Sequence, residues 1–571
     1  MPPVEPLELT PRRLRGATSS GSARELAWSY ALGLAIAVAF YATLLFGGSL
    51  HGYDWGSHHY NYFDWVRISL TDFHTLPLFM NDAWVTKNFL ANAESPILGP
   101  LVALLCVLST GAYIKLLLVA FTAAGFAGMF FLLREFGIRR EIACFVATVF
   151  AFNGFFVSHL SVGHPWVMGG QLLPALVCSY RRAVLGHSGA LWIAAGINAC
   201  TILGGQHQPF IWQNLFLAFL ALLWAIRARD ARPIRSWALL VLATTGLGAV
   251  KLLPMLAEFA DYDPTARVPG LPLSLVFTTF LAGGQHPEWA PPGISYDHGS
   301  GWWEYAFYVG PIAFGCLAVG LVRARRCWPT AVIAAGFFVL AIEWPPPVQG
   351  FDLWSWLEGL PIWRTQRGPS RFLFPALFGV AVVSAVGLQR LWERDLGRWP
   401  RAAPLAGAAL CLLAAVELHS ASLPWQRGAL GPALSSRDHR PHPLVLGTPG
   451  VVSAELTGFA PNRLVYHVRA ERPGRIVFPF RYGRGAAEWR IEGLEGPTAA
   501  SGPTDSRRLL SEGGKLAIDL SVGEADIAMV YRPRLFTTGW VTSAVTLLAA
   551  LGALIRSRSY RGRPAACRTS A

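Results

Sequence analysis

The first apolar segment of the chain reads Leu26-Ala-Trp-Ser-Tyr-Ala-Leu-Gly-Leu-Ala-Ile-Ala-Val-Ala-Phe-Tyr-Ala-Thr-Leu-Leu-Phe46. As a helix rising about 1.5 Å per residue, it is long enough to cross a hydrocarbon core of about 30 Å. No small-x-small cleavage site follows it, so we expect a retained span rather than a signal peptide. Of the 571 residues, 53% are hydrophobic and 14% are charged, whereas soluble domains carry roughly 25% charged residues. The composition therefore predicts a membrane protein with many spans.

Similar apolar segments recur along the whole chain. The full set lies at residues 26–46, 96–112, 114–133, 141–159, 164–180, 189–205, 208–226, 236–255, 306–322, 328–343, 372–391, 403–420 and 535–555. Arginine clusters such as Arg139/Arg140 mark cytoplasmic loops, so topology rather than nucleic-acid binding explains the net charge of +14. All clusters fall on one side only if residues 96–112, which begin with Pro and Gly, dip in without crossing. We therefore expect twelve spans, one re-entrant segment and cytoplasmic termini, with thirteen spans as the alternative.

This topology divides the chain into four parts. They are a cytoplasmic segment at residues 1–25, a multi-span domain at 26–420 with its first outer loop at 47–94, an outer domain at 421–533, and the last span with a basic cytoplasmic tail at 534–571. In the outer domain, Arg463-Leu-Val-Tyr-His-Val-Arg469 and Lys515-Leu-Ala-Ile-Asp-Leu520 alternate polar and apolar residues, as half-buried strands do. We expect an antiparallel β-sandwich there. The eight cysteines form no CxxC pair, which argues against disulfides and a structural zinc site.

The first outer loop begins His51-Gly-Tyr-Asp-Trp-Gly-Ser-His-His-Tyr-Asn-Tyr-Phe-Asp-Trp65, an unusual density of acids, histidines and rings. Asp54 follows the first span closely, where a carboxylate is placed to act as general base toward a hydroxyl group. The alternative is a hydrated loop aspartate within an aromatic interface belt. Asp54 and His58 also have the spacing of two metal ligands on one helix face, although a third ligand is missing from the pattern. His58 otherwise suits a surface or substrate contact.

Three arginines precede a later span on the expected outer side: Arg364, Arg367 and Arg371. Positive charge there runs against the usual inside bias. Guanidinium groups match phosphate oxygens with two parallel hydrogen bonds, so these arginines are candidates for binding a lipid phosphate. The alternative is snorkelling, or ion pairing with Glu358 or Asp352.

Further polar residues lie at the expected outer ends of spans. His164, Gln206 and His207 suit helix capping or hydrogen bonding between helices as well as substrate binding. Glu304 lies between two aromatic residues, and a carboxylate at the membrane boundary needs a partner. One of the three arginines is the candidate partner.

The order of these features resembles the YfhO-like bacterial membrane proteins, which belong to the GT-C superfamily of glycosyltransferases. The matching residues are Asp54, Leu76-Pro-Leu78, Phe89-Leu-Ala-Asn92, Leu132-Leu-Arg-Glu-Phe-Gly137, Phe150-Ala-Phe-Asn-Gly-Phe-Phe-Val-Ser-His-Leu160, Gly163-His-Pro165, Glu304, Tyr308-Val-Gly310, Arg371-Phe-Leu373 and Tyr531-Arg-Pro533. The loop here reads Tyr53-Asp-Trp55, where the commoner form begins with a Gly-Asp-Thr-like sequence. No single motif is specific, but their order and spacing together cover most of the chain.

The resemblance implies an all-α, GT-C-like membrane domain that transfers a sugar on the outer face of the bacterial cytoplasmic membrane. The donor would be a polyprenyl-phosphate-linked sugar, and the acceptor an envelope polysaccharide, teichoic acid-like polymer, lipid or protein. Asp54 would be the catalytic base, the arginines would bind the departing phosphate, and Lys87 and Glu304 would orient sugar or phosphate. The superfamily implies inversion of configuration. A divalent metal ion is an open alternative among cofactors, and membrane lipids are expected partners.

Two other function classes compete with the transferase. A transporter or flippase of a lipid-linked glycan needs polar residues deep inside the spans, and the available ones are Asn153, Asn198, Gln213, Asn214 and Glu417. A non-catalytic scaffold of envelope assembly would leave Asp54 without a role. We expect the transferase because it gives a role to the polar residues of the outer loops.

Overall fold

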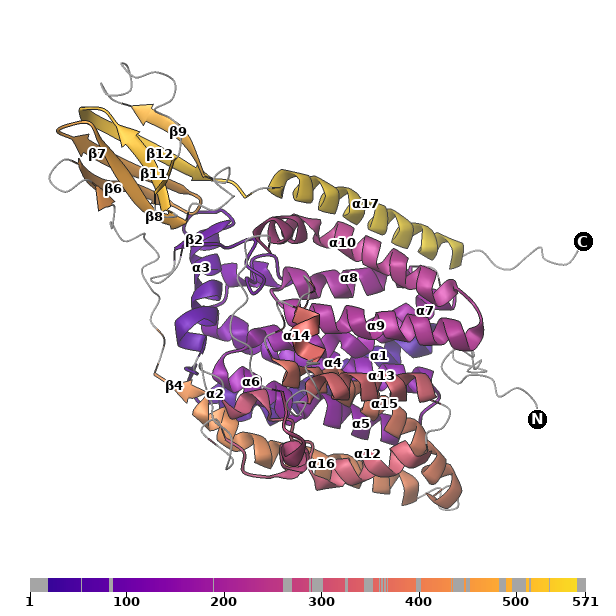
Figure 1. Cartoon of the computed structure of the whole chain (residues 1–571). Helices are drawn as coiled ribbons and strands as arrows, with labels where there is room; N and C mark the ends of the chain where they lie inside the picture. Colours follow the sequence, from indigo (N-terminus) through magenta and orange to yellow (C-terminus); the bar gives the residue numbers. More distant parts are fainter. Residues whose placement is uncertain are drawn as a thin grey trace, which may run out of the picture.

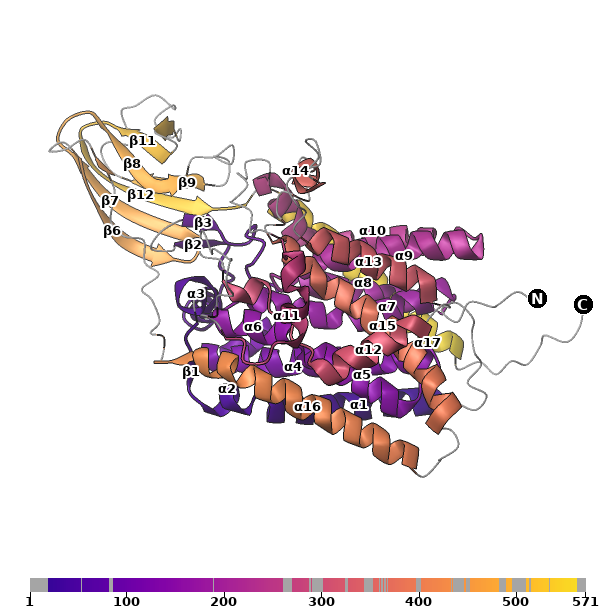
Figure 2. The same ribbon diagram turned by 60° about the horizontal axis from the view of Figure 1, so that its bottom comes forward.

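The helices of the protein form a bundle, and a β-sheet region lies at one end of it (Figure 1). The computed structural model describes residues 19–52, 54–81, 86–187, 189–259, 270–286, 289, 301–323, 327–342, 353–358, 360, 363, 366, 368–396, 402–432, 434, 446–447, 452–481, 489–495, 510–512, 515–533 and 535–561. Most of the long helices run roughly along one direction in both views (Figure 2). Helix α17 (Phe536–Arg561) begins beside the β region and packs along α10 (Arg232–Phe259) as it runs away from it.

Eight helices in the described part of the chain are long and apolar enough to cross a membrane. They are Ala23–Phe40, Thr110–Glu135, Arg140–Val162, His207–Ala228, Arg232–Glu258, Pro369–Arg394, Pro404–Gly428 and Phe536–Ser557. Three shorter apolar helices are Ala190–Leu203, Pro311–Val322 and Trp328–Ala341. The protein is therefore mostly helical, and the described residues contain eight candidate spans, whereas the sequence predicted twelve spans.

Two expected segments are not continuous long α-helices. Residues 164–180 fold as the 3-10 helix η3 (Pro165–Leu172) followed directly by α7 (Leu173–Val184). Residues 96–112 contain the 3-10 helix η2 (Val102–Cys106) of 5 residues before α4 (Thr110–Glu135) begins. At about 2.0 Å per residue, η2 is about 10 Å long, a third of a hydrocarbon core. This helix is too short to cross a membrane.

The C-terminal region contains two four-stranded antiparallel sheets among the residues that the structure describes. Across the first sheet the strand order is β10 (Leu510–Glu512), β11 (Lys515–Leu520), β8 (Gly474–Arg481) and β5 (Leu446–Gly447). Across the second sheet the order is β6 (Val452–Ala460), β7 (Arg463–Ala470), β12 (Gly523–Tyr531) and β9 (Trp489–Glu495). Phe478 and Ile518 from one sheet and Tyr466 and Ile527 from the other share one hydrophobic core. The expected antiparallel β region is confirmed, and both alternating stretches form strands in it.

The β region is attached to the segment at residues 47–94, the expected first outer loop, through the hairpin of β2 (Phe79–Asn81) and β3 (Thr86–Asn88). The ring of Phe79 lies in the core of the β region, with its centroid 4.9 Å from that of Trp489. Asn462, in the turn between β6 and β7, accepts hydrogen bonds from the backbone amides of Leu78 and Phe79 at 2.6 and 3.1 Å. Its Nδ2 donates to the carbonyl of Leu76 at 2.9 Å. One side chain therefore satisfies three backbone groups of the loop.

Replacing Asn462 by Gly should loosen this attachment without straining the turn. Asn462 has a φ of 71°, a conformation that Gly adopts freely, so the variant loses only the three hydrogen bonds. We expect a cost of about 1–3 kcal/mol and faster hydrogen exchange at the amides of Leu78 and Phe79. Asn462→Asp keeps the accepting oxygen, so its loss of stability and its exchange rates should lie between those of the wild type and of Asn462→Gly. Equal exchange rates in wild type and both variants would contradict this role.

Candidate functional site

A break in one apolar helix positions the first part of the site. Helix α5 (Arg140–Phe152) ends at Asn153, whose side chain caps α6 (Gly154–Val162) by accepting a hydrogen bond from the amide of Phe155 at 3.0 Å. The amide of Gly154 donates to the carbonyl of Tyr308 at 2.7 Å, and a Cβ on Gly154 would lie 2.5 Å from the nitrogen of Tyr308. This close approach brings α6, which carries His159, beside the segment that carries Glu304.

A glycine at the end of α6 positions the second part. Gly163 has a φ of 99°, and a Cβ there would lie 2.3 Å from the backbone nitrogen of Trp55. Trp55 also donates from Nε1 to the carbonyl of Leu160 at 2.8 Å. The π-helix η1 (Trp55–His59), capped by Asp54, therefore lies against the turn that leads to His164.

Asp54, His164 and His159 form a hydrogen-bonded chain. Oδ2 of Asp54 lies 2.8 Å from Nε2 of His164, and Nδ1 of His164 lies 2.8 Å from Nδ1 of His159. The side chain of Asp54 is 33% exposed and that of His164 is 9% exposed, so the chain runs from the surface inward. Burial alone raises the pKa of Asp54, but the hydrogen bond from His164 and the nearby His59 and His58 outweigh it and lower the pKa to about 2. Asp54 is therefore ionised at neutral pH.

Glu304 and Arg371 form a buried ion pair beside this chain. Glu304 lies in the 3-10 helix η5 (Trp302–Glu304) and Arg371 in η9 (Pro369–Phe372). Nε and Nη2 of Arg371 donate to the two carboxylate oxygens at 2.7 and 2.5 Å. Nη1 donates to Oε1 of Gln208 at 3.0 Å, and Cζ lies 4.7 Å from the ring centroid of Trp166. The expectation that an arginine is the partner of Glu304 is met by this geometry.

Arg371 already has several hydrogen-bond and ring partners, and these limit its expected role in binding a phosphate. Arg371 is buried and its guanidinium group already binds a carboxylate, an amide and an aromatic face. These hydrogen bonds use three of its five N–H groups, so one N–H group on Nη1 and one on Nη2 remain for a phosphate. Arg364 and Arg367 lie outside the described residues. Lys87 belongs to β3, and its side chain is likewise outside the described part.

A second group of polar residues lies close to the first, and all of them except the half-exposed Glu94 are buried. Nε2 of His59 is 3.9 Å from Oε2 of Glu94, and burial lowers the pKa of His59 to about 4, so it is neutral at pH 7. Lys251, inside helix α10, is fully buried and donates from Nζ to the carbonyl of Ser95 at 2.5 Å. His207, at the start of α9 (His207–Ala228), is also buried.

The remaining expected residues surround these two groups. Gln206 is buried and lines a pocket together with Glu94, Tyr113 and Trp166. Trp166 also stacks on His164, with 5.3 Å between the ring centroids. His58 is half-buried within η1. This pocket has a volume of only about 20 Å³, and it adjoins His164 through Trp166.

Sequence reasoning missed several members of the site. His159, Gln208, Glu94 and Lys251 were not singled out, although His159 and Lys251 interrupt apolar segments, which is a known signal of function in membrane proteins. His159, His164 and Glu304 could hold a metal ion, because one ligand atom from each lies within 4.8 Å of the others. This group includes neither Asp54 nor His58, the pair whose spacing suggested metal ligands.

Comparison with protein-family models and with curated proteins gives no significant match. The chemistry of the site therefore has to be inferred from its own geometry. An ionised, partly exposed carboxylate bonded to an imidazole suits proton transfer from a hydroxyl group.

Proposed function

We propose that the protein is a membrane glycosyltransferase of the GT-C type. It moves a sugar from a polyprenyl-phosphate donor to a hydroxyl group of an envelope acceptor, on the outer face of the bacterial cytoplasmic membrane. The observation that carries the proposal is the 2.8 Å bond between Asp54, in the loop after the first helix, and His164. It holds an ionised, partly exposed carboxylate in a fixed position, as a base acting on a bound hydroxyl group requires.

The proposed reaction is a direct displacement at the anomeric carbon, with inversion as the superfamily resemblance implies. The acceptor oxygen forms a bond to the anomeric carbon, the bond from that carbon to the phosphate oxygen breaks, and polyprenyl phosphate leaves with the bonding electron pair. The hydroxyl proton goes to Asp54. Because the low pKa of Asp54 makes it a weak base, the proton moves late, when the attacking oxygen has become acidic. His164 holds the carboxylate in place.

We place the acceptor hydroxyl group against the exposed part of the Asp54 carboxylate, because this side chain is 33% exposed. The pocket lined by Trp166 and Gln206 has a volume of about 20 Å³, which holds about one water molecule and is too small for a sugar. Since Arg371 is bound to Glu304, we assign the phosphate to Arg364 and Arg367 of the same segment. Lys87 is assigned to orienting the donor.

The proposed architecture has twelve spans, one re-entrant segment at residues 96–112 and both termini in the cytoplasm. A transport function is less well supported. Asn198 and Asn214 bond to each other at 3.0 Å, and Nε2 of Gln213 donates to the carbonyl of Gly169 at 2.7 Å. These intramembrane polar groups are satisfied locally by protein, so they suit helix packing better than a substrate path.

The proposal is tested on the purified chain in lipid nanodiscs, with a polyprenyl-phosphate hexose as donor and a glycan or lipid alcohol as acceptor. We expect release of polyprenyl phosphate together with a glycosylated acceptor, both followed by mass spectrometry. The same donor is then placed in the inner leaflet of liposomes that contain the protein. Movement of intact donor to the outer leaflet, without cleavage in any acceptor mixture, would identify a flippase and refute the transferase.

A further inference from the structure

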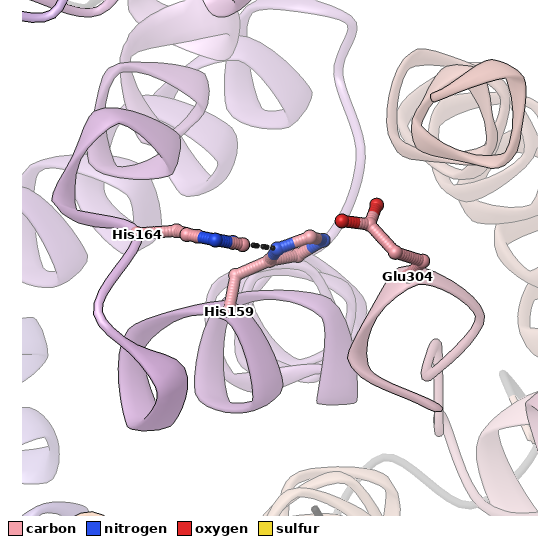
Figure 3. A group of neighbouring side chains, drawn as sticks. All are labelled: His159, His164 and Glu304. Carbon is pink, nitrogen blue, oxygen red and sulfur yellow. Dashed lines mark hydrogen bonds between the residues drawn. The ribbon is translucent and has the colours of Figure 1, made fainter. Parts of the chain in front are cut away.

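Three buried side chains from separate segments converge on one small region (Figure 3). His159 lies in α6, His164 follows that helix, and Glu304 ends η5, with exposed fractions of 0%, 7% and 2%. Figure 3 shows His159 between His164 and Glu304. We propose that these three residues bind one divalent metal ion of the zinc class. The inference does not depend on sugar transfer, because none of the three is a reactant in the proposed displacement.

The first argument is the orientation of His164. Its Nε2 is bonded to the carboxylate of Asp54 at 2.8 Å. A neutral imidazole has one N–H group, and the ionised carboxylate accepts it, so Nδ1 of His164 carries a bare lone pair that faces His159. A carboxylate behind a histidine is the usual support of a metal-bound imidazole, because it fixes the tautomer and the ring orientation.

The second argument is an unsatisfied nitrogen on His159. Nε2 of this side chain is fully buried and has no hydrogen-bond partner among the residues that the structure describes. If Nδ1 of His159 donates to His164, Nε2 has a bare lone pair. A bare polar atom in a buried position is costly unless something satisfies it. A cation bound at Nε2 of His159 satisfies this nitrogen, and Nδ1 of His164 joins the same ion when it gives up its hydrogen bond with Nδ1 of His159.

The ion pair of Glu304 with Arg371 does not prevent the same carboxylate from binding a metal ion. A carboxylate offers about four lone-pair sites, and the fork of Arg371 takes one on each oxygen. Asp54 and Glu304 supply two negative charges and Arg371 one positive charge, so with neutral imidazoles the group has a net charge of −1. A divalent cation is therefore attracted to this region.

The ligand set indicates which metal binds. Two imidazole nitrogens and one carboxylate oxygen suit zinc and similar ions, whereas magnesium and calcium prefer all-oxygen sites. Tetrahedral zinc with bonds of about 2.0–2.1 Å needs donor atoms about 3.3 Å apart. One ligand atom from each residue lies within 4.8 Å of the others, so binding one ion requires side-chain shifts of about 1.5 Å, which break the hydrogen bond between the two Nδ1 atoms. Three protein ligands with one open position are the pattern of catalytic zinc sites.

The test uses the full chain, purified without a histidine tag, stripped with a chelator and reloaded with zinc or magnesium. We expect about one zinc ion per chain by elemental mass spectrometry, no retained magnesium, and a higher thermal midpoint with zinc. Cobalt in place of zinc should give the visible absorption bands of a tetrahedral nitrogen–oxygen site. Substoichiometric zinc in the wild-type chain, with an unchanged thermal midpoint, overturns the proposal and leaves a hydrogen-bonded histidine pair.

Variants show whether the bound ion lies at this site. His159→Ala and Glu304→Gln should each weaken zinc binding by about 100-fold or more, since each removes a direct ligand. His187→Ala is the matched control, because His187 is exposed between α7 and α8 (Ala190–Leu203). It should bind zinc as the wild type does. Binding that survives both ligand substitutions places the ion elsewhere and refutes the site.

Discussion

Replacing Asp54 by Asn is expected to lower the rate of sugar transfer by about 10²–10⁴-fold, the usual contribution of a general base. Asn keeps the size of the side chain, and its amide oxygen can still accept the hydrogen bond from Nε2 of His164. The variant loses the negative charge and the ability to take up the hydroxyl proton. We therefore expect unchanged donor binding and a modestly lower thermal midpoint, because the ionised form that the fold stabilises is lost, while the rate falls far more than the stability.

The control for this experiment is Asp72→Asn. Asp72 belongs to the same outer loop, is exposed, and accepts a hydrogen bond from its neighbour Thr71 at 2.6 Å. It should transfer sugar at the wild-type rate. Asp64 is not a fair control, because it is buried and bonded to Arg67 and Thr110, so its replacement also costs stability. Single-turnover transfer in nanodiscs gives the measurement, and a wild-type rate in Asp54→Asn would reduce Asp54 to a surface residue.

The grouping of the site residues could be anticipated from the order of the spans. Residues at span ends on one side of a membrane come together when the helices pack, so Asp54, His164, Glu304 and Arg371 were candidates for one region. The structure places them in two adjoining clusters. Charge alone also predicted that Glu304 needs an arginine, since a buried carboxylate without a partner is costly.

His159 could not be placed in the same way. It lies in an apolar stretch, and its position depends on the break at Asn153 and on the left-handed turn at Gly163. Such breaks are set by contacts with distant segments, here Tyr308 and Trp55. Hydrophobic periodicity contains no information about those contacts. The contact between His159 and His164 is therefore seen in the structure and could not be predicted from the sequence.

The fold shows a similar division between local and distant information. Alternating patterns were sufficient to locate β7 and β11, because each reflects one buried and one exposed face of a sheet. The insertion of Phe79 into the core of the β region joins residues far apart in sequence, and no local pattern predicts it. Hydropathy also cannot separate an apolar segment that forms the short helix η2 from one that crosses.

Replacing Arg371 by Met is expected to destabilise the protein by about 3–5 kcal/mol, because it leaves Glu304 buried and uncompensated. The substitution also removes the hydrogen bond from Arg371 to Gln208 and the contact of its guanidinium group with the ring of Trp166. The measurement is equilibrium unfolding of the chelator-treated protein in mixed micelles, so that no bound cation offsets the carboxylate. If Arg371 instead served mainly to bind the donor phosphate, the single variant would keep its stability and lose donor affinity by about 1.5–3 kcal/mol.

The double variant Arg371→Met/Glu304→Met separates the two explanations. Removing both charges replaces the buried pair by apolar side chains of similar size, which in other proteins is often neutral or stabilising. Most of the lost stability should therefore return, so the coupling energy between the two positions should be at least about 3 kcal/mol, the upper end of the range for residues in contact. A double variant as unstable as Arg371→Met would assign the loss to Gln208 and Trp166 instead. Recovery of stability would mean that Arg371 is present to neutralise Glu304, the carboxylate that faces the histidine pair.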